Sequence, residues 1–368
     1  MPGMDVAVSL LALGAACAFT LAFGGACAWP AWLRRGGYAL AVAAALLAAA
    51  RFALTVWGWL PAAATANSAD FLIFYHAGQA ARRWQPLYYL AGLRQDSGAV
   101  VFFRHAPAGA LLFAPWTWLP YHDALNAWRL LNVGIYVLTL LAVLRLLRIG
   151  WRTPLALGLA ALWFVSAPSR DSLALGQWDA LFLALVTGAL ALYWRRRDRD
   201  LLAGALLALP VALKFYPALL LLAPLLARRW RVLAGCVGAG VALLALGALG
   251  AGPANTGVFL FHVLPALGGG TLYAENQTLY AFVGRLLATQ LVAKGVNAHY
   301  PVLVTRVIAG TLGLAILAVT ALVTWRCRRS KLGGALCFVL PMPAALLIVP
   351  TAWAHYATWT LLPLAVLA

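Results

Sequence analysis

The chain has 368 residues, of which 64% are hydrophobic and only 10% are charged, and its formal net charge is +18. This composition excludes an ordinary soluble domain and is typical of a protein that crosses a membrane several times. A nucleic-acid-binding protein gathers its basic residues on one wet face, whereas here they recur in short clusters between apolar runs. The charge therefore indicates membrane topology, and no nucleic-acid partner is expected.

Five basic clusters are expected to mark the cytoplasmic side, because Lys and Arg are enriched in cytoplasmic loops. Their members are Arg34 and Arg35; Arg145, Arg148 and Arg152; Arg195, Arg196, Arg197 and Arg199; Arg228, Arg229 and Arg231; and Arg326, Arg328, Arg329 and Lys331. The first apolar run, 6–28, has no basic residue before it and is long enough to span. We therefore expect a membrane span there, not a cleaved signal peptide, with the N-terminus outside.

A first outer loop is expected at about 61–122, after spans at 6–28 and 38–60. This loop is too polar and too interrupted to cross the membrane. Its segment 107–120 is apolar and rich in aromatic residues but too short to span, which favours a helix lying at the membrane surface. Asp70 then lies outside, close to that surface.

The rest of the chain predicts further spans and a second outer segment at about 253–301. The spans are expected at 124–147, 153–167, 173–194, 232–252, 303–325 and 332–350, and a last apolar piece at 357–368 is short for a crossing. No fixed-period repeat and no separate soluble domain is visible. The predicted fold is a single all-α membrane domain over 1–368, with about nine spans and outer helices at the membrane surface.

The segment 201–227 is flanked by basic clusters on both sides and interrupted by Lys214 and Pro217. A single crossing would place the later arginine cluster outside, against the usual charge bias. The alternative, which we favour, is a re-entrant hairpin, since about 12 residues rising ~1.5 Å each pass the middle of a ~30 Å hydrocarbon core. Lys214 would then lie at its tip, near helix N–H groups that favour an anion.

Asp70 is one of only nine acidic residues and precedes an apolar helix pattern. A carboxylate in this place could cap that helix. It could also act as a general base toward an acceptor hydroxyl, and the two roles are compatible if one oxygen stays free. Asp70 is therefore the favoured candidate base, while the other acids that remain possible are Asp96, Asp123, Asp171, Asp179 and Glu275.

Lys214 is the strongest signal for a binding site, because an ionisable group at membrane depth is costly. Its alternative is to extend its side chain to the membrane surface. A phosphate or carboxylate is its natural ligand, and Arg285 could contact the same group, although an exposed outer arginine is equally consistent with the sequence.

His355 lies between Trp353 and Tyr356, whose aromatic rings are explained by anchoring at the membrane surface. The histidine could hydrogen-bond a phosphate or a hydroxyl, or be a buried structural residue. No Cys or His spacing is typical of a metal site, so neither a metal nor another cofactor is expected.

Several segments, taken together, resemble glycosyltransferase family 87. They are 70-DFLIFYHAGQA-80 with Leu87 and Tyr88, 102-FFRHAPAGALLFAP-115, 175-LGQWDALFLAL-185, 203-AGALLALPVALKFYPALLLLAPLL-226, 276-NQTLYAFVGR-285 and 353-WAHY-356. The family contains polytopic enzymes of the C-type glycosyltransferase superfold that take sugars from polyprenyl phosphate, among them mycobacterial mannosyltransferases of phosphatidylinositol mannoside synthesis. The resemblance covers about 65–360.

The resemblance implies a role for each matching residue. Asp70 matches the general base, Lys214 belongs to a hairpin near the donor phosphate, and His355 matches an active-site histidine. Arg285 is assigned to donor phosphate binding, and the assigned substrate-binding residues are Tyr88, Gln177, Asn276 and Gln277. The implied reaction is inverting transfer of a hexose, with mannose favoured, to a lipid-linked or cell-envelope glycan at the outer face of a bacterial inner membrane.

The chemistry of such a transfer fits these residues, because one base activates the acceptor and a phosphate leaves without a general acid if cations stabilise it. A glycosidase, by contrast, needs a second carboxyl group. A transporter or flippase of an anionic lipid or sugar phosphate is the main alternative, since it would use a broken helix and an intramembrane lysine in the same way. A purely structural membrane subunit explains neither Lys214 nor His355.

Overall fold

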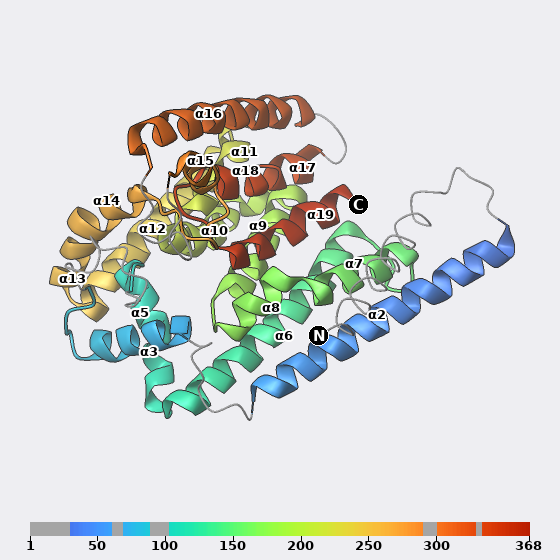
Figure 1. Cartoon of the computed structure of the whole chain (residues 1–368), viewed down its shortest axis with the longest axis horizontal. Coiled ribbons are helices and arrows are strands. Elements are labelled where there is room, and N and C mark those ends of the chain that lie inside the picture. The colour runs from blue at the N-terminus through green and yellow to red at the C-terminus, as the bar shows by residue number, and fades with distance from the viewer. Residues whose placement is uncertain (1–29, 61–68, 89–102, 290–299, 329–332) are drawn as a thin grey trace.

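The computed structural model describes residues 30–60, 69–88, 103–289, 300–328 and 333–368. Over these ranges the chain is all-helical, with an isolated bridge between Asn276 and Trp353 and no strand (Figure 1). The all-α prediction is confirmed. The span expected at 6–28 lies outside the described residues.

The elements follow one another in chain order. The first half contains α2 (Ala31–Trp59), α3 (Ala69–Arg82), α5 (Pro107–Phe113), the 3-10 helix η3 (Ala114–Trp118), α6 (Tyr121–Leu147), α7 (Pro154–Val165), α8 (Ala167–Ala174), α9 (Asp179–Arg195) and η4 (Arg197–Arg199). The second half contains α10 (Asp200–Lys214), η5 (Tyr216–Leu221), α11 (Leu222–Leu226), α12 (Trp230–Ala251), α13 (Pro253–Val258), the π-helix η6 (Phe259–Val263), α14 (Leu264–Ala266), η7 (Leu267–Gly269), α15 (Leu279–Leu287), α16 (Val302–Cys327), α17 (Gly333–Val339), α18 (Pro341–Ile348), η9 (Ala354–Thr360) and α19 (Leu361–Leu367).

Four described helices are long and apolar enough to cross a membrane: α2, α6, α12 and α16. A fifth is added if α8 and α9, which meet at a 120° bend, count as one broken span. The helices at the other expected spans are shorter. The structure therefore fits a multi-pass membrane protein, while the count of nine spans stays a prediction.

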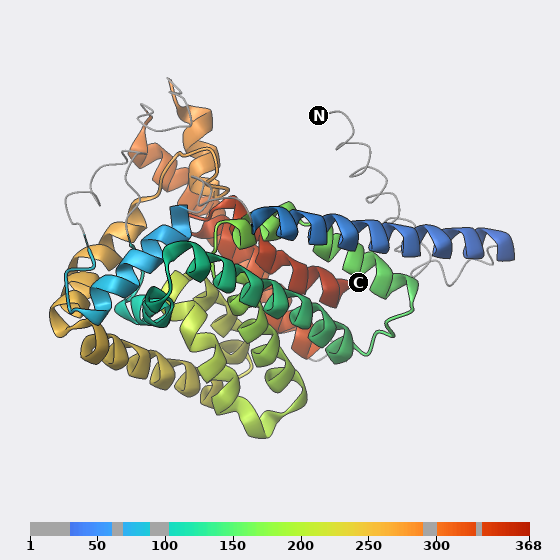
Figure 2. The ribbon, with the colours of Figure 1, turned by 90° about the horizontal axis from the view of Figure 1, so that it is seen from below.

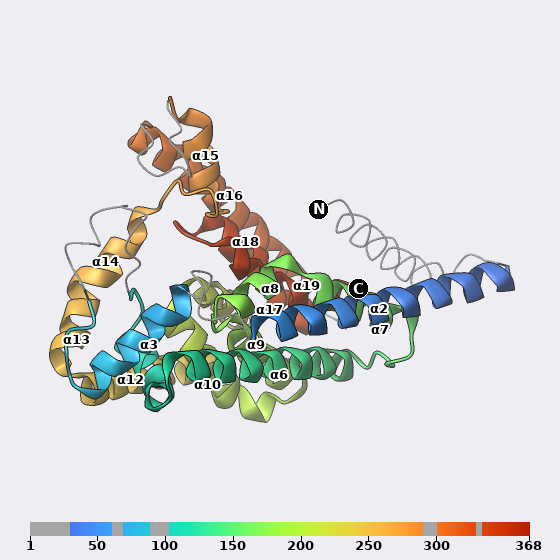
Figure 3. The same ribbon diagram turned by 60° about the horizontal axis from the view of Figure 1, so that its bottom comes forward.

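Two peripheral helices flank the central group. Helix α2 packs on α7 and extends past the rest of the molecule, and α16 lies on the opposite side (Figures 1 and 2). Helix α15 packs on α16 and projects with it away from the rest of the molecule (Figure 3). Helices α9 and α10 lie in the centre, and most of their buried residues belong to one large core. Helix α12 packs on α10 at the edge of the molecule (Figure 2).

The segment after α9 doubles back on itself. Helix α10 ends at Lys214, where Phe215 takes a left-handed φ of 56°, and η5 and α11 return. Arg229, just before α12, donates from Nε to the Asp200 carboxylate at the start of α10 over 3.0 Å. Both ends of the segment therefore meet, with Lys214 at the tip; its depth in a membrane stays a prediction.

Helices α10 and α12 approach each other through two glycines. A Cβ on Gly204 would lie 1.9 Å from the Val232 carbonyl oxygen, and one on Gly235 would lie 2.1 Å from the Leu201 carbonyl oxygen. Small residues at such contacts let helix backbones come close, which is a common basis of packing in membranes. Any larger side chain at either position would separate the hairpin from α12.

The helix expected at 173–194 is interrupted, and α9 starts only at Asp179. The chain turns at Gly176, whose φ of +70° suits glycine, and a Cβ there would lie 2.8 Å from Cβ of Phe71. The expected span at 332–350 is likewise two short helices, α17 and α18, with Pro341 beginning the second. In both places a backbone requirement overrides a continuous apolar pattern.

Candidate active site

Asp70 lies in the first turn of α3, where the helix dipole favours a negative charge. Its Oδ2 accepts a hydrogen bond from Nε2 of Gln177 at 2.8 Å, and the Phe71 amide donates to the Leu175 carbonyl at 3.1 Å. The Asp70 carboxylate therefore accepts this hydrogen bond from the segment between α8 and α9, not from its own helix. The second oxygen, Oδ1, has no hydrogen-bond partner among the described residues.

The environment of Asp70 suits a base. Burial raises the pKa of Asp70, and the Gln177 hydrogen bond and the positive charge of Lys214 lower it by less. A raised pKa makes a carboxylate a better proton acceptor while it remains ionised near neutral pH.

Trp178 separates the two polar residues that follow Gly176. Its buried ring stacks on Phe74 of α3 with centroids 4.6 Å apart. The His105 and Trp178 rings pack nearly at right angles, with their centroids also 4.6 Å apart. This packing directs Gln177 toward Asp70 and Asp179 toward Lys214.

Asp179 is fully buried and is held by three donors. Lys214 Nζ lies 2.8 Å from Oδ1, Ser172 Oγ donates to Oδ2 at 2.9 Å, and Trp359 Nε1 donates to Oδ1 at 3.2 Å. A buried ion pair is tolerated only when further hydrogen bonds satisfy its atoms, as they do here. The sequence leaves Asp179 as one of five other possible acids and does not favour it, although an acid inside an expected span is costly for the same reason as Lys214.

Lys214 and His355 approach Asp179 from separate parts of the chain. The Lys214 ammonium also lies 3.6 Å from the centre of the Tyr356 ring, a cation–π contact. His355 Nε2 lies 3.9 Å from Oδ2 of Asp179, and burial lowers the pKa of His355 to about 3, so the imidazole is neutral near pH 7. Of the predicted site residues, Asp70, Gln177, Lys214 and His355 are thus linked through one short segment, 177–179.

Four buried polar atoms around this group have no hydrogen-bond partner among the described residues. They are Gln177 Oε1, Trp178 Nε1, Tyr216 Oη and His355 Nε2. Buried polar atoms are nearly always hydrogen-bonded, so such a cluster indicates a place for a polar ligand. Tyr216 stacks on Tyr356 with ring centroids 5.1 Å apart, which brings its hydroxyl into the same surroundings as Lys214.

Tyr88 is connected to the site through His105. The Tyr88 hydroxyl donates to the His105 carbonyl at 2.7 Å, and His105 Nδ1 donates to the Leu213 carbonyl, next to Lys214, at 2.8 Å. These contacts tie the first outer loop to the tip of the hairpin. A direct contact of Tyr88 with substrate stays a prediction.

Asn276 is fully buried and joins two distant segments. Its Nδ2 donates to the carbonyls of Thr271 at 2.8 Å and Pro350 at 3.0 Å, and its Oδ1 accepts from the Ala352 amide at 2.9 Å. All of these hydrogen bonds are internal, so Asn276 fixes the segment that leads into His355.

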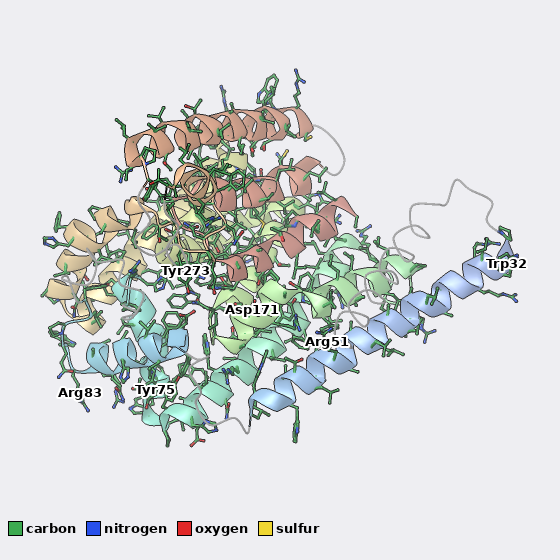
Figure 4. The ribbon with its side chains drawn as sticks, viewed as in Figure 1. Trp32, Arg51, Tyr75, Arg83, Asp171 and Tyr273 are labelled. Atoms are coloured by element: carbon green, nitrogen blue, oxygen red, sulfur yellow. The ribbon has the colours of Figure 1, made fainter. Side chains whose placement is uncertain are left out.

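Gln277 and Arg285 belong to the same connection. Gln277 has an exposed side chain, and its backbone N–H donates to the Ala352 carbonyl at 2.8 Å. Arg285 Nη1 donates to the carbonyls of Tyr273 at 3.1 Å and Asn276 at 3.0 Å. Tyr273, labelled in Figure 4, packs edge-on against Trp353 at 5.8 Å. The substrate-binding and phosphate-binding roles assigned to these residues stay predictions.

Within the described ranges, no group of three or more His, Cys, Asp or Glu side chains is arranged to hold a metal ion. The expectation that transfer needs neither a metal nor another cofactor stays a prediction.

The sequence model of glycosyltransferase family 87 matches residues 103–350, about two thirds of the chain. The chain belongs to glycosyltransferase family 87. The matched region of this family 87 member contains Gln177, Asp179 and Lys214, whereas Asp70 and His355 lie outside it. No curated protein and no solved structure shows significant similarity to the chain. The family resemblance of the sequence is thereby confirmed, and the activity it carries is glycosyl transfer.

Proposed function

We propose that the protein is an inverting glycosyltransferase that moves a hexose from a polyprenyl-phosphate donor to a hydroxyl of a lipid-linked or cell-envelope glycan. Mannose is the proposed sugar, and the outer face of a bacterial inner membrane is the proposed location. Family membership supplies glycosyl transfer, and the donor, the sugar and the location rest on the resemblance and on the charge pattern of the chain.

One observation carries the proposal: a carboxylate oxygen without a hydrogen-bond partner among the described residues, and a buried cation, occur on two sides of the same segment. Asp70 contacts Gln177, and two residues later Asp179 holds Lys214 and neighbours His355. This arrangement supplies a base for the acceptor and a positive charge for a phosphate.

The proposed reaction is a single displacement. Oδ1 of Asp70 takes the proton of the acceptor hydroxyl, and the acceptor oxygen attacks the anomeric carbon. The bond from that carbon to the phosphate oxygen breaks, and its electron pair stays on the phosphate, where Lys214 stabilises the charge. Because attack and departure occur on opposite sides, the anomeric configuration inverts.

The proposed sidedness is supported by the ends of the helices. Arg195 at the end of α9 donates to the Leu146 carbonyl at the end of α6 over 3.1 Å, and Arg229 binds Asp200 at the start of the hairpin. These basic ends lie at the opposite end of α9 and α10 from Asp179 and Lys214. If the arginines face the cytoplasm, the site faces outward.

The test is sugar transfer from radiolabelled polyprenyl-phosphate-mannose to a membrane lipid extract by purified protein. Wild type is compared with Asp70→Asn and with Asp171→Asn, which removes an exposed carboxylate on α8 (Figure 4). We expect product from wild type and Asp171→Asn, and a rate on the order of 10²- to 10⁴-fold lower from Asp70→Asn.

Each outcome has a distinct meaning. Wild-type rates from a folded Asp70→Asn would remove Asp70 as the base. Product from another polyprenyl-phosphate hexose, but not from the mannose donor, would overturn the sugar alone. Movement of intact donor across the membrane of vesicles that contain the protein, without formation of a glycosylated acceptor, would support the transporter alternative against the proposal.

A further inference from the structure

The turn between α8 and α9 is held from α6 by two adjacent side chains. Trp128 Nε1 donates to the Gly176 carbonyl at 2.7 Å, and Arg129 Nε donates to the Ala174 carbonyl at 3.0 Å. Arg129 Nη2 donates to the same oxygen. Two of the backbone carbonyls in this short turn are therefore fixed by side chains of a long neighbouring helix.

Burying Arg129 carries a desolvation cost, because its guanidinium is charged. Only 6% of it is exposed, and its polar contact among the described residues is with a carbonyl, with the Trp59 ring 5.8 Å away. A buried guanidinium without a carboxylate partner contributes little net stability, because its desolvation offsets the hydrogen bonds it makes. A charge-assisted hydrogen bond to one carbonyl does, however, restrict the position of that carbonyl.

The turn that these residues hold determines both halves of the site. Gly176 has a left-handed φ of +70°, and the next residue, Gln177, hydrogen-bonds Asp70. Two residues further on, Asp179 binds Lys214. A displacement of the turn therefore moves the partner of the base and the partner of the cation together.

We propose that Trp128 and Arg129 are positioning residues for transfer, which set the place of Asp70 relative to the Asp179–Lys214 pair by holding the Gly176 and Ala174 carbonyls. This inference rests on the proposed function. Neither residue touches the reacting atoms in this account, and their effect passes through Gln177 and Asp179.

The key variant is Trp128→Phe, which keeps an aromatic ring against Phe113 and Trp116 but removes the indole donor. Trp163→Phe is a matched control, because Trp163 is also buried and donates from Nε1 to a backbone carbonyl, that of Tyr136, at 3.2 Å. The two substitutions should lower the melting temperature to a similar extent, since each removes one such hydrogen bond.

Only Trp128→Phe should impair catalysis. We expect kcat to fall on the order of tenfold to a hundredfold with the donor KM little changed, because small displacements of reacting groups are costly. The acid limb of the pH profile should also move to higher pH, since a displaced Gln177 stabilises the Asp70 carboxylate less. The charged groups that act on Asp70 are Lys214, which lowers its pKa, and Asp179, which raises it. Arg129→Lys, which keeps a donor, should retain more activity than Arg129→Met.

A second readout needs no substrate. Hydrogen–deuterium exchange of the amides in 175–179 should quicken in Trp128→Phe and stay at the wild-type rate in Trp163→Phe. Equal exchange in both variants, or activity losses that follow the melting temperature in both, would overturn the positioning role. If exchange is faster in Trp128→Phe alone but wild type itself transfers no sugar, then Trp128 does position the turn. In that case the proposed function is overturned instead.

Discussion

Lys214 Nζ lies 2.8 Å from Asp179 Oδ1, and the two side chains are 1% and 0% exposed. The cation assigned to the donor phosphate is therefore already compensated by a carboxylate. If the donor phosphate binds at Lys214, as proposed, it would share the ammonium with Asp179, and the carboxylate would hold the ammonium in place after the phosphate leaves.

Asp179→Asn should strongly destabilise the protein, because it leaves the Lys214 charge buried without compensation. Breaking one side of a buried pair costs about 3–5 kcal/mol. Thermal unfolding in detergent measures the effect. The double variant Lys214→Met with Asp179→Leu is the control: it should regain much of the stability, since both charges are gone, and still transfer no sugar. A melting temperature for Asp179→Asn equal to that of wild type would contradict this account.

Gln177→Leu should change the pH dependence of transfer. In the proposed mechanism the ionised form of Asp70 is the active one. The Gln177 hydrogen bond stabilises that form and so lowers the pKa of Asp70. Without the bond the pKa rises, and activity is lost at a higher pH as the solution is acidified. The profile of kcat/KM measures the shift, and Gln85→Leu, at an exposed glutamine, should leave the profile unchanged. An unshifted acid limb in Gln177→Leu would show that this bond does not tune Asp70.

Asn276→Ala should lower stability by about 1–3 kcal/mol, because it leaves buried groups at Pro350 and Ala352 without their partner. Gln277→Ala, which removes a neighbouring exposed amide, should be nearly neutral. Thermal unfolding and donor KM are measured side by side. A raised KM at an unchanged melting temperature would instead support the substrate-binding role predicted for Asn276.

Gly204→Ala and Gly235→Ala should each disrupt the packing of α10 on α12, since each added methyl would overlap a backbone carbonyl. Gly238→Ala provides the matched control on α12, where no atom lies within 4 Å of the added Cβ. That control should be neutral or stabilising by up to about 1 kcal/mol, as for glycine to alanine in a helix interior. Equal melting temperatures for Gly204→Ala, Gly235→Ala and Gly238→Ala would contradict the close crossing.

The sequence predicts the all-helical class and the turn at Lys214 because composition and charge clusters act locally. It also selects Asp70, Lys214 and His355 as candidate site residues, since polar residues are rare in an apolar chain, and the structure links all three through residues 177–179. The rule that singled out Lys214 applies equally to Asp179, which lay inside the expected span 173–194. What spacing cannot show is that these two residues, 35 positions apart, are each other's partners.

The roles of Asn276 and Arg285 show the opposite limit. The resemblance assigns Asn276 to substrate binding and Arg285 to the donor phosphate, and both roles stay predictions. In the structure the two side chains also donate hydrogen bonds to backbone carbonyls, among them those of Thr271, Pro350 and Tyr273. Which carbonyls need a partner depends on how distant segments meet, and no local pattern records that.

The separation along the chain between the first and last residues of the candidate site bears on biosynthesis. Asp70 and His355 are 285 positions apart (355 − 70), and Gln177 and Lys214 lie between them. While the ribosome is still translating, a chain that already holds the candidate base does not yet hold the histidine. The proposed site is therefore incomplete until translation has passed residue 355, and no sugar transfer is expected from the nascent protein before that point.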